Sequence, residues 1–145
     1  MIGLLQRVTS SRVEVAGQVV GEIERGIMVL VGVQKGDDEA RAERLAERLL
    51  GYRVFPDADD KMNLSVRDIQ GGVLLVPQFT LAADTRKGTR AGFSTAAEPA
   101  VGKLLFEYLV ARIRQLHPQT AAGEFGAYMQ VSLINDGPVT FWLDV

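Results

Sequence analysis

An unbroken apolar segment, residues 27–33 (IMVLVGV), constrains the fold of this chain more than any other feature. A strand with one wet face alternates apolar and polar residues, whereas a strand covered on both faces does not. This segment therefore predicts a strand with protein packed against both faces. A second apolar run, residues 73–81 (VLLVPQFTL), predicts another strand. Pro77 interrupts that run, which indicates a sheet edge, a bulge or a strand end.

Further strands are predicted near both ends of the chain. Alternating valines between residues 13 and 19 flank Ala16-Gly17-Gln18, a pattern typical of a β-hairpin. Residues 52–55 predict a short strand. The apolar segments at residues 131–134 and 139–143 predict a final pair of strands, which a turn can join.

Two segments predict helices. Asp37 or Asp38 can cap the N-terminus of the first, and Gly51 suits its end. The second extends from about Pro99 to Leu116, with proline in its first turn and an apolar stripe along one side. Because the predicted strands, roughly seven, cluster rather than alternate with helices, the chain predicts an α+β fold.

The predicted strands offer more apolar surface than two helices can cover. Packing of sheet against sheet, or burial of the remainder in a homodimer, would cover the rest. We therefore expect layered β-sheets in a barrel-like sandwich, with two main helices and a homodimeric assembly. Residues 1–145 suit a single domain with one core.

The composition excludes several kinds of active site. The chain has no cysteine, which removes disulfides, thiolate metal sites and cysteine nucleophiles. The single histidine, His117, lies at the expected end of the second helix, where capping is its simpler role. A Ser-His-Asp triad and a multi-histidine metal site are therefore not expected, and no metal or other cofactor is predicted.

The charge of the chain limits its contact with nucleic acids. The net charge is −2 and the pI about 5.4, whereas proteins that wrap a nucleic acid usually carry a large basic face. A nucleic acid partner would be gripped over a small patch or at one end. The first residues show no signal-peptide pattern, and no apolar run approaches the ~20 residues of a membrane span. A cytoplasmic location without a membrane partner is expected.

Two stretches place polar residues and a proline at the end of an apolar strand, a usual location for functional sites. The first is Pro77-Gln78-Phe79-Thr80-Leu81. Without a histidine or cysteine nearby, the Thr80 hydroxyl is a poor nucleophile, and ordering of a turn is its simpler role. The backbone N–H groups of Phe79 and Thr80 could instead hold a carbonyl oxygen, if they point away from the sheet ladder.

The second stretch is Asn135-Asp136-Gly137-Pro138-Val139-Thr140. Glycine tolerates unusual dihedral angles, and a Gly-Pro bond can be cis at a cost of only ~0.5–1 kcal/mol. A cis bond would turn the chain sharply and could direct carbonyl oxygens into a pocket. The simpler alternative is an ordinary β-turn between two strands.

Together these stretches resemble the D-aminoacyl-tRNA deacylase family. The resemblance extends from Arg7 in LLQRV through KMNLSV (61–66) and QFTL (78–81) to FGAYMQVSLINDGPVT (125–140). It therefore covers essentially the whole chain. One departure is Pro77, where the family often has serine.

The resemblance implies hydrolysis of the ester that joins a D-amino acid, or mischarged glycine, to the terminal adenosine of tRNA. It implies homodimers with active sites at the subunit interface, in which a cis Gly-Pro dipeptide reaches into the partner's pocket. Thr80 matches the family's proposed nucleophile; in another model the ribose 2′-hydroxyl assists and backbone amides hold the substrate. The implied site residues are Gln78, Phe79 and Thr80 for catalysis, and Arg7, Met129, Gly137 and Pro138 for substrate binding and chiral selection.

The chemistry of an aminoacyl ester agrees with these implications. The ester is already activated, so oriented amides and a positioned water can supply much of the stabilisation. If backbone groups anchor the substrate, a rigid barrier on the L side of its α-carbon rejects L-amino acids, and glycine passes. Discrimination of ~10⁴ requires roughly 5.5 kcal/mol, more than the ~1–3 kcal/mol of one methylene. The stiffness of proline suits Pro138 to this role.

The polar loop of residues 82–97 carries Arg86, Lys87 and Arg90. We expect these cations to bind phosphates at the acceptor end of tRNA, with a solvated loop as the alternative. Part of the loop, KGTRAGF (87–93), differs from the family's common KGNRPSF. The competing prediction is a non-catalytic dimeric module that binds aminoacyl-tRNA. A general esterase finds no support, because the chain has no Gly-x-Ser-x-Gly motif.

Overall fold

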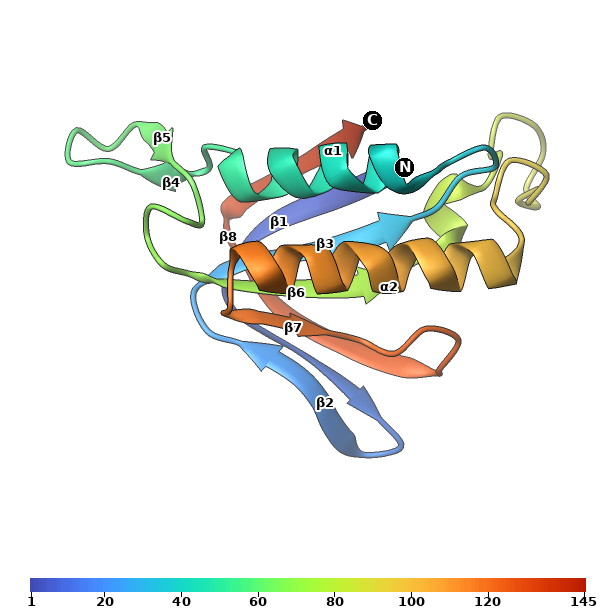
Figure 1. The fold of residues 1–145 in the computed structure, drawn as a ribbon. Helices are drawn as coiled ribbons and strands as arrows, with labels where there is room; N and C mark the ends of the chain where they lie inside the picture. The colour runs from blue at the N-terminus through green and yellow to red at the C-terminus, as the bar shows by residue number, and fades with distance from the viewer.

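Two helices lie side by side against one face of a curved sheet in the computed structural model, which describes residues 1–145 (Figure 1). The elements in chain order are β1 (Ile2–Val15), β2 (Gln18–Ile23), β3 (Gly26–Gly32), α1 (Glu39–Gly51), β4 (Phe55–Pro56), β5 (Met62–Leu64), β6 (Gly72–Pro77), the 3-10 helix η1 (Phe79–Ala82), α2 (Pro99–Leu116), β7 (Thr120–Ala122) and β8 (Met129–Asp144).

The main sheet has the strand order β2-β1-β3-β6-β7, and β8 pairs with β1 as well. The β3–β6 and β6–β7 pairs are parallel, and the pairs that β1 makes are antiparallel. The two outer strands approach each other, because a Cβ added to Gly21 of β2 would lie 2.8 Å from the Ala122 oxygen of β7. The sheet is thus nearly closed, which confirms the predicted barrel-like α+β arrangement.

Apolar side chains cover both faces of β3, as its unbroken run predicted. Ile27 and Val29 belong to the main core beneath α1 and α2. Met28 points the other way, into a smaller core with Val8 and Leu74. Met129, Val131 and Leu133 of β8 pack against this smaller core.

Both helices form where the sequence predicts them. Asp38 caps α1, and its carboxylate accepts a hydrogen bond from the Arg41 N–H at 3.0 Å. His117 caps the C-terminus of α2, and its backbone N–H bonds to the Ile113 oxygen. The buried His117 ring places Nε2 2.6 Å from the Gly71 oxygen, so Nε2 is the nitrogen that carries the hydrogen. The histidine therefore has a structural role, next to Gly71 and immediately before β6.

Two strand predictions are wrong, and a third holds as far as Pro77. Residues 52–54 lie outside any strand, and β4 contains only Phe55–Pro56. The strand predicted from residue 73 ends at Pro77, which confirms the strand end that the proline indicated, and the chain then forms η1.

The second error concerns the C-terminal segments, which form one 16-residue strand instead of a pair. Both halves of β8 pair with β1, which is long enough to accept them end to end, so no hairpin forms. With β7 added, the chain has eight strands rather than roughly seven.

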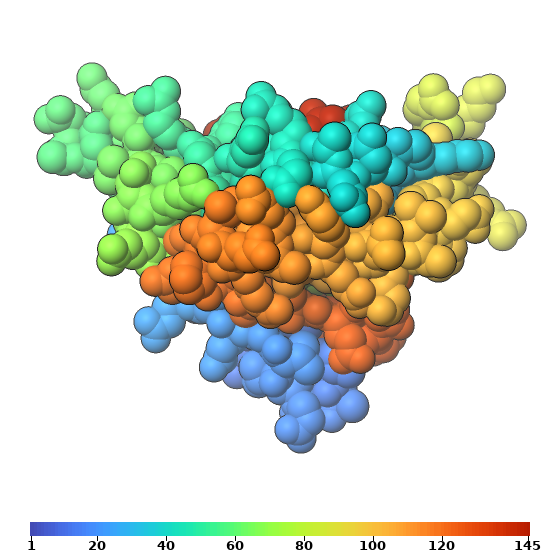
Figure 2. Space-filling view, in the orientation of Figure 1, coloured from blue at the N-terminus to red at the C-terminus, as the bar shows by residue number.

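Two segments project from opposite ends of the molecule, the β4–β5 hairpin and the loop of residues 82–97 (Figure 2). Neither helix is both long enough and apolar enough to cross a bilayer.

Candidate active site

The first candidate region lies where β6 ends. The Gln78 N–H still bonds to Val31 of β3 at 2.8 Å, and the chain then turns away into η1. The hydrogen bonds of this turn begin with Leu81 N–H to the Gln78 oxygen at 3.2 Å. The N–H groups of Phe79 and Thr80 precede that bond and have left the sheet ladder. Two adjacent amides at this position can bind a carbonyl oxygen.

The Thr80 hydroxyl is exposed, and its hydrogen-bond partner is the Gln78 side chain. The Gln78 amide nitrogen donates to Thr80 Oγ1. An amide N–H cannot remove a proton from a hydroxyl, so this contact does not activate Thr80 as a nucleophile. His117, the one imidazole of the chain, lies at the opposite end of β6. The local geometry therefore favours the backbone over the side chain as the reactive feature.

Apolar groups surround this turn. Phe79 is 60% exposed and packs against Phe93, which is 47% exposed, with ring centroids 5.3 Å apart. Met129 reaches the same strand end, because a Cβ on Gly123 would lie 2.9 Å from Met129 Sδ and 3.4 Å from Pro77 Cδ. The structure thus brings Met129 close to Pro77, immediately before the turn.

The second candidate region is a bulge in β8. Gln6 pairs with Thr140 and Val8 pairs with Asn135, so residues 136–139 lie opposite Arg7 alone. The Gly137-Pro138 bond in the bulge is cis, and both residues are exposed. The simpler sequence prediction, a β-turn between two strands, is therefore wrong.

Glycine is required at position 137 for two reasons. Its φ is +126°, in a region that L-residues rarely adopt. A Cβ there would also lie 2.8 Å from Val139 Cγ2 and 3.0 Å from Arg7 Nη2. The backbone of the bulge and the Arg7 side chain are thus in close contact.

Arg7 supports the bulge through its guanidinium group. Its Nε donates to the Asp136 backbone oxygen at 3.1 Å and lies 3.3 Å from the Asp136 carboxylate. Its Nη1 donates to the Val54 oxygen at 2.7 Å. The side chain is only 13% exposed, so these bonds are largely shielded from water. Arg7 therefore ties the bulge to the segment between α1 and β4.

The two candidate regions lie far apart within one chain. Pro77 aligns across the sheet with Val31 and then with Gly3 of β1, and β8 is one strand further. Three strand spacings of ~4.8 Å therefore separate β6 from β8. The bulge faces Arg7, which is about 13 Å along β1 from Gly3 at ~3.3 Å per residue. Measured along the sheet, roughly 20 Å separates the bulge from the Pro77 turn.

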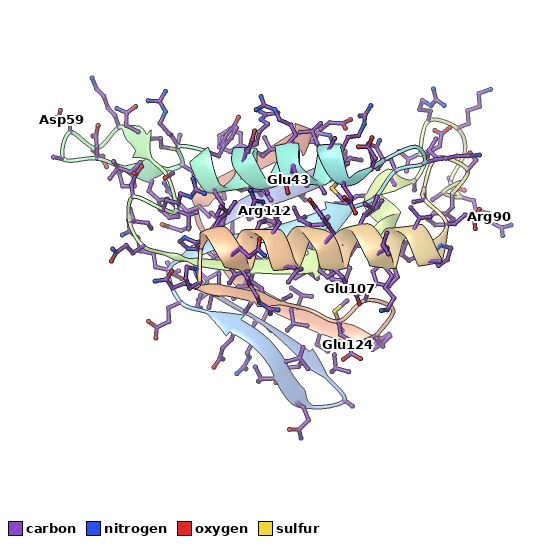
Figure 3. All side chains as sticks on the ribbon, viewed as in Figure 1. Glu43, Asp59, Arg90, Glu107, Arg112 and Glu124 are labelled. Atoms are coloured by element: carbon purple, nitrogen blue, oxygen red, sulfur yellow. The ribbon has the colours of Figure 1, made fainter.

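The cationic loop, residues 84–92, is closed at its base by a bridge between Asp84 and Gly92. Arg86 folds back onto Asp84, with Nε and Nη2 donating to its two carboxylate oxygens at 2.9 and 2.7 Å. These hydrogen bonds hold the pKa of Asp84 well below its usual range and raise the pKa of Arg86. Lys87 and Arg90 are exposed and form no ion pair, and Arg90 projects away from the body (Figure 3).

The three cations of the cationic loop are therefore not equally free to bind an external anion. Arg86 is compensated by Asp84, whereas Lys87 and Arg90 can meet an external anion. The three predicted cations do line one hollow of about 490 Å³, together with Asp84, Gly92 and Ser94.

The sequence alone assigned no role to Asn135, although the residue begins the second candidate stretch, residues 135–140. Its side-chain nitrogen donates to two backbone oxygens, those of Arg7 and Val139, each at 2.9 Å. Asparagine before glycine is common in ordinary turns, so the local pattern concealed this bridging role.

Comparison with known proteins gives a consistent result over the full length. The family model described as D-Tyr-tRNA(Tyr) deacylase matches residues 4–144. A D-aminoacyl-tRNA deacylase of Stutzerimonas stutzeri is 61% identical over 144 residues, 99% of either chain. A D-aminoacyl-tRNA deacylase of Pseudomonas syringae pv. tomato is 64% identical over 141 residues, 97% of either chain.

Two solved structures share the fold. One, described as a c-Myc DNA Unwinding Element Binding Protein, superposes with a TM-score of 0.95 at 36% identity, covering 100% of this chain and 99% of that one. A probable eukaryotic D-amino acid tRNA deacylase superposes with a TM-score of 0.87 at 17% identity, covering 99% and 98%. The second likeness concerns the fold alone.

Proposed function

This chain belongs to the D-aminoacyl-tRNA deacylase family. We propose that its backbone groups both promote hydrolysis of the D-aminoacyl ester and reject L-amino acids. Members of the family are enzymes, and hydrolysis of D-aminoacyl-tRNA is the activity of this chain. The observation that carries the proposal is a pair of exposed backbone features, the amides of Phe79 and Thr80 and the Gly137-Pro138 bulge.

In the proposed reaction, water attacks the carbonyl carbon of the ester. The amides of Phe79 and Thr80 hold the oxygen on which negative charge develops. The bond from that carbon to the ribose oxygen then breaks, the ribose oxygen takes up one proton of the attacking water and becomes a hydroxyl, and the free D-amino acid leaves as its carboxylate while the other proton passes to solvent. The vicinal ribose hydroxyl is placed to assist the proton transfers, since the only partner of the Thr80 hydroxyl is an amide donor.

The Gly137-Pro138 segment is proposed to select the D-enantiomer by exclusion. With the ester carbonyl on the Phe79 and Thr80 amides, the D and L side chains point in opposite directions from the α-carbon. Backbone carbonyl oxygens on the L side leave no room for an L side chain, whereas a hydrogen atom fits. Mischarged glycyl-tRNA is therefore a second proposed substrate. Support comes from the Arg7 bonds that fix the bulge.

A homodimer is proposed because one chain cannot supply both features to one substrate. Roughly 20 Å separates them along the sheet, more than the length of an aminoacyl group. A second copy can bring its Gly137-Pro138 segment to the Phe79 turn, so that the active site lies at the interface. The surface available for this contact includes exposed apolar side chains, Phe79 at 60%, Phe93 at 47%, Ile134 at 60% and Trp142 at 53%.

The acceptor end of tRNA is proposed to bind at the cationic loop. Lys87 and Arg90 are the available cations there, and Arg86 holds the shape of the loop through Asp84. A patch this small agrees with the net charge of −2. A small patch suits binding to one end of the tRNA rather than binding along its length.

Deacylation of paired substrates tests the proposal. Purified protein is incubated with D-Tyr-tRNA, L-Tyr-tRNA and Gly-tRNA, and release of the amino acid is measured. Hydrolysis of the D and glycyl esters with the L ester intact is expected. Tight binding of D-Tyr-tRNA without hydrolysis would instead support a non-catalytic binding module.

Thr80→Val tests the source of the chemistry, because it removes the hydroxyl and keeps the β-branched shape. We expect kcat within ~3-fold of wild type, since the oxygen that it removes bears no catalytic proton transfer. A loss of ~10³-fold or more would assign the nucleophile to the Thr80 side chain. Thr89→Val, at an exposed position in the cationic loop, is the matched control.

A further inference from the structure

The bulge in β8 leaves two carbonyl oxygens without their expected ladder partners. The register of β1 with β8 is regular as far as the pair Gln6 and Thr140. One further step would pair Arg7 with Val139. The chain instead leaves the ladder over residues 136–139, so the facing groups of that pair do not form the usual bonds.

The side chain of Asn135 occupies this gap. Its Nδ2 donates one hydrogen bond to the Arg7 oxygen and one to the Val139 oxygen, both at 2.9 Å. A carboxamide nitrogen has two N–H donors, which is the number that the two carbonyl oxygens require. The Asn135 side chain thus supplies the two N–H donors that these carbonyl oxygens would otherwise find in the ladder.

We propose that Asn135 is a positioning residue for chiral selection, whose carboxamide closes the base of the loop that presents Gly137 and Pro138. This inference rests on the proposed function, in which that dipeptide excludes L-amino acids. Asn135 itself lies at the base of the loop and acts through the backbone.

The orientation of the Asn135 amide is fixed by a short chain of hydroxyl and amide groups. Thr140 Oγ1 donates to Asn135 Oδ1 at 3.2 Å, and Gln6 Nε2 donates to Thr140 Oγ1 at 3.4 Å. A reversed amide would place its oxygen against two carbonyl oxygens, which repel it. The observed orientation is therefore the one that the surrounding acceptors demand.

Arg7 and Asn135 hold the two ends of the loop. The Arg7 guanidinium bonds to the oxygen of Asp136, where the loop begins. The Asn135 amide bonds to the oxygen of Val139, where the loop ends, and to the backbone of Arg7 itself. Both ends are therefore tied to one residue of β1, and this restrains the exposed dipeptide between them, to which no side chain bonds directly.

The test compares Asn135→Asp and Asn135→Ala with wild type, measuring kcat/KM for D-Tyr-tRNA and L-Tyr-tRNA between about pH 4.5 and pH 7.5. At neutral pH the ionised carboxylate that Asn135→Asp introduces has no donor and faces two carbonyl oxygens. We expect the D-to-L ratio of this variant to fall ~10- to 100-fold, since a displaced group in an active site costs up to that factor. Asn135→Ala should lower the ratio at every pH.

Acidification provides a readout that a merely structural role does not move. A protonated aspartic acid regains one O–H donor, so the D-to-L ratio of Asn135→Asp should recover in part towards pH 4.5. The wild-type ratio should stay constant over the same range. Gln130→Glu, which places a charge on an exposed position of β8, is the control and should behave as wild type.

The outcomes separate this inference from the proposed function. If wild type discriminates and folded Asn135→Asp discriminates equally at every pH, Asn135 has no positioning role. If wild type itself accepts D and L esters alike, the proposed function fails instead. Should Asn135→Asp and Asn135→Ala both fail to fold, Asn135→Ser, which keeps one donor, decides: an intermediate D-to-L ratio supports the inference, and an unchanged ratio overturns it.

Discussion

The bulge at residues 136–139 and the cationic loop, residues 84–92, both interrupt regular structure with exposed polar chain, but they are held very differently. The bulge is bonded at both ends by Arg7 and Asn135, through contacts that reach two further segments. The cationic loop is bonded at its base, through Asp84 and Gly92, and by one ion pair within the loop.

This difference matches what each region is proposed to recognise. Exclusion of one enantiomer depends on a steric contact, which fails if the backbone moves by about 1 Å. Attraction of a phosphate depends on charge and changes little over such a displacement, since Coulomb energy falls slowly with distance. A rigid bulge and a loosely held cationic loop are therefore both suited to their tasks. The same kinds of mutation should therefore affect the two regions differently.

The largest effect is expected from Gly137→Ala in the bulge. Gly137→Ala adds a methyl group 2.8 Å from Val139 Cγ2 and 3.0 Å from Arg7 Nη2, so the bulge must shift. We expect kcat/KM for D-Tyr-tRNA to fall ~100-fold. Gly88→Ala is the matched control, because Gly88 also has a positive φ, +67°, but has nothing within 4 Å of the added atom. Equal losses in both variants would contradict the comparison.

A smaller effect is expected from Arg7→Lys. Two different nitrogens of the guanidinium reach Val54 and Asp136, and one ammonium cannot span both acceptors in the same way. The D-to-L ratio should fall ~10-fold while KM for the tRNA stays the same. Arg12→Lys, at an exposed position of the same strand, is the control. A change in KM alone would place Arg7 in tRNA binding instead.

The cationic loop should respond in KM and not in chirality. Removing Lys87 and Arg90 together should raise KM for charged tRNA ~5- to 10-fold and reduce its salt dependence by about one charge per residue. Arg86→Ala should have less effect on the salt dependence, because Asp84 already compensates its charge. Steady-state kinetics at several salt concentrations measure both. An altered D-to-L ratio would show that the two regions are coupled.

The smallest effect on activity is expected from Glu43→Gln, which lies in neither region. Glu43 of α1 accepts hydrogen bonds from Tyr108 at 2.7 Å and from Arg112 at 2.9 Å on α2 (Figure 3). Chiefly the Tyr108 bond, and then the Arg112 bond, lower the pKa of Glu43 below 4.5.

A lowered pKa means that the Glu43 carboxylate stabilises the fold above pH 4.5, and that this contribution disappears as pH falls through the folded-state pKa. Glu43→Gln should therefore lower Tm at pH 7, and the difference from wild type should shrink below about pH 4.5. Thermal unfolding measured at both pH values checks this. The D-to-L ratio and the salt dependence should not change, and a change in either would show that helix packing controls the site.

Much of the fold was predictable because its signals are local. The cap at Asp38 and the extent of α2 depend on residues within a turn or two. The hairpin turn at Ala16 and Gly17 likewise needs only their positive φ angles, +49° and +78°. Prediction failed where a local signal had two outcomes, as at the Asn-Asp-Gly sequence within residues 135–137, which makes a turn in one context and a bulge in another.

The sequence by itself determined the helices, the strand covered on both faces, and the two motifs to which we assign the chemistry. Only the tertiary structure decided that both halves of β8 pair with β1 and that Arg7 and Asn135 form hydrogen bonds to the two ends of the bulge. The physical reason is separation along the chain. Arg7 and Asp136 are 129 residues apart, so their contact depends on strand pairing that no local pattern specifies.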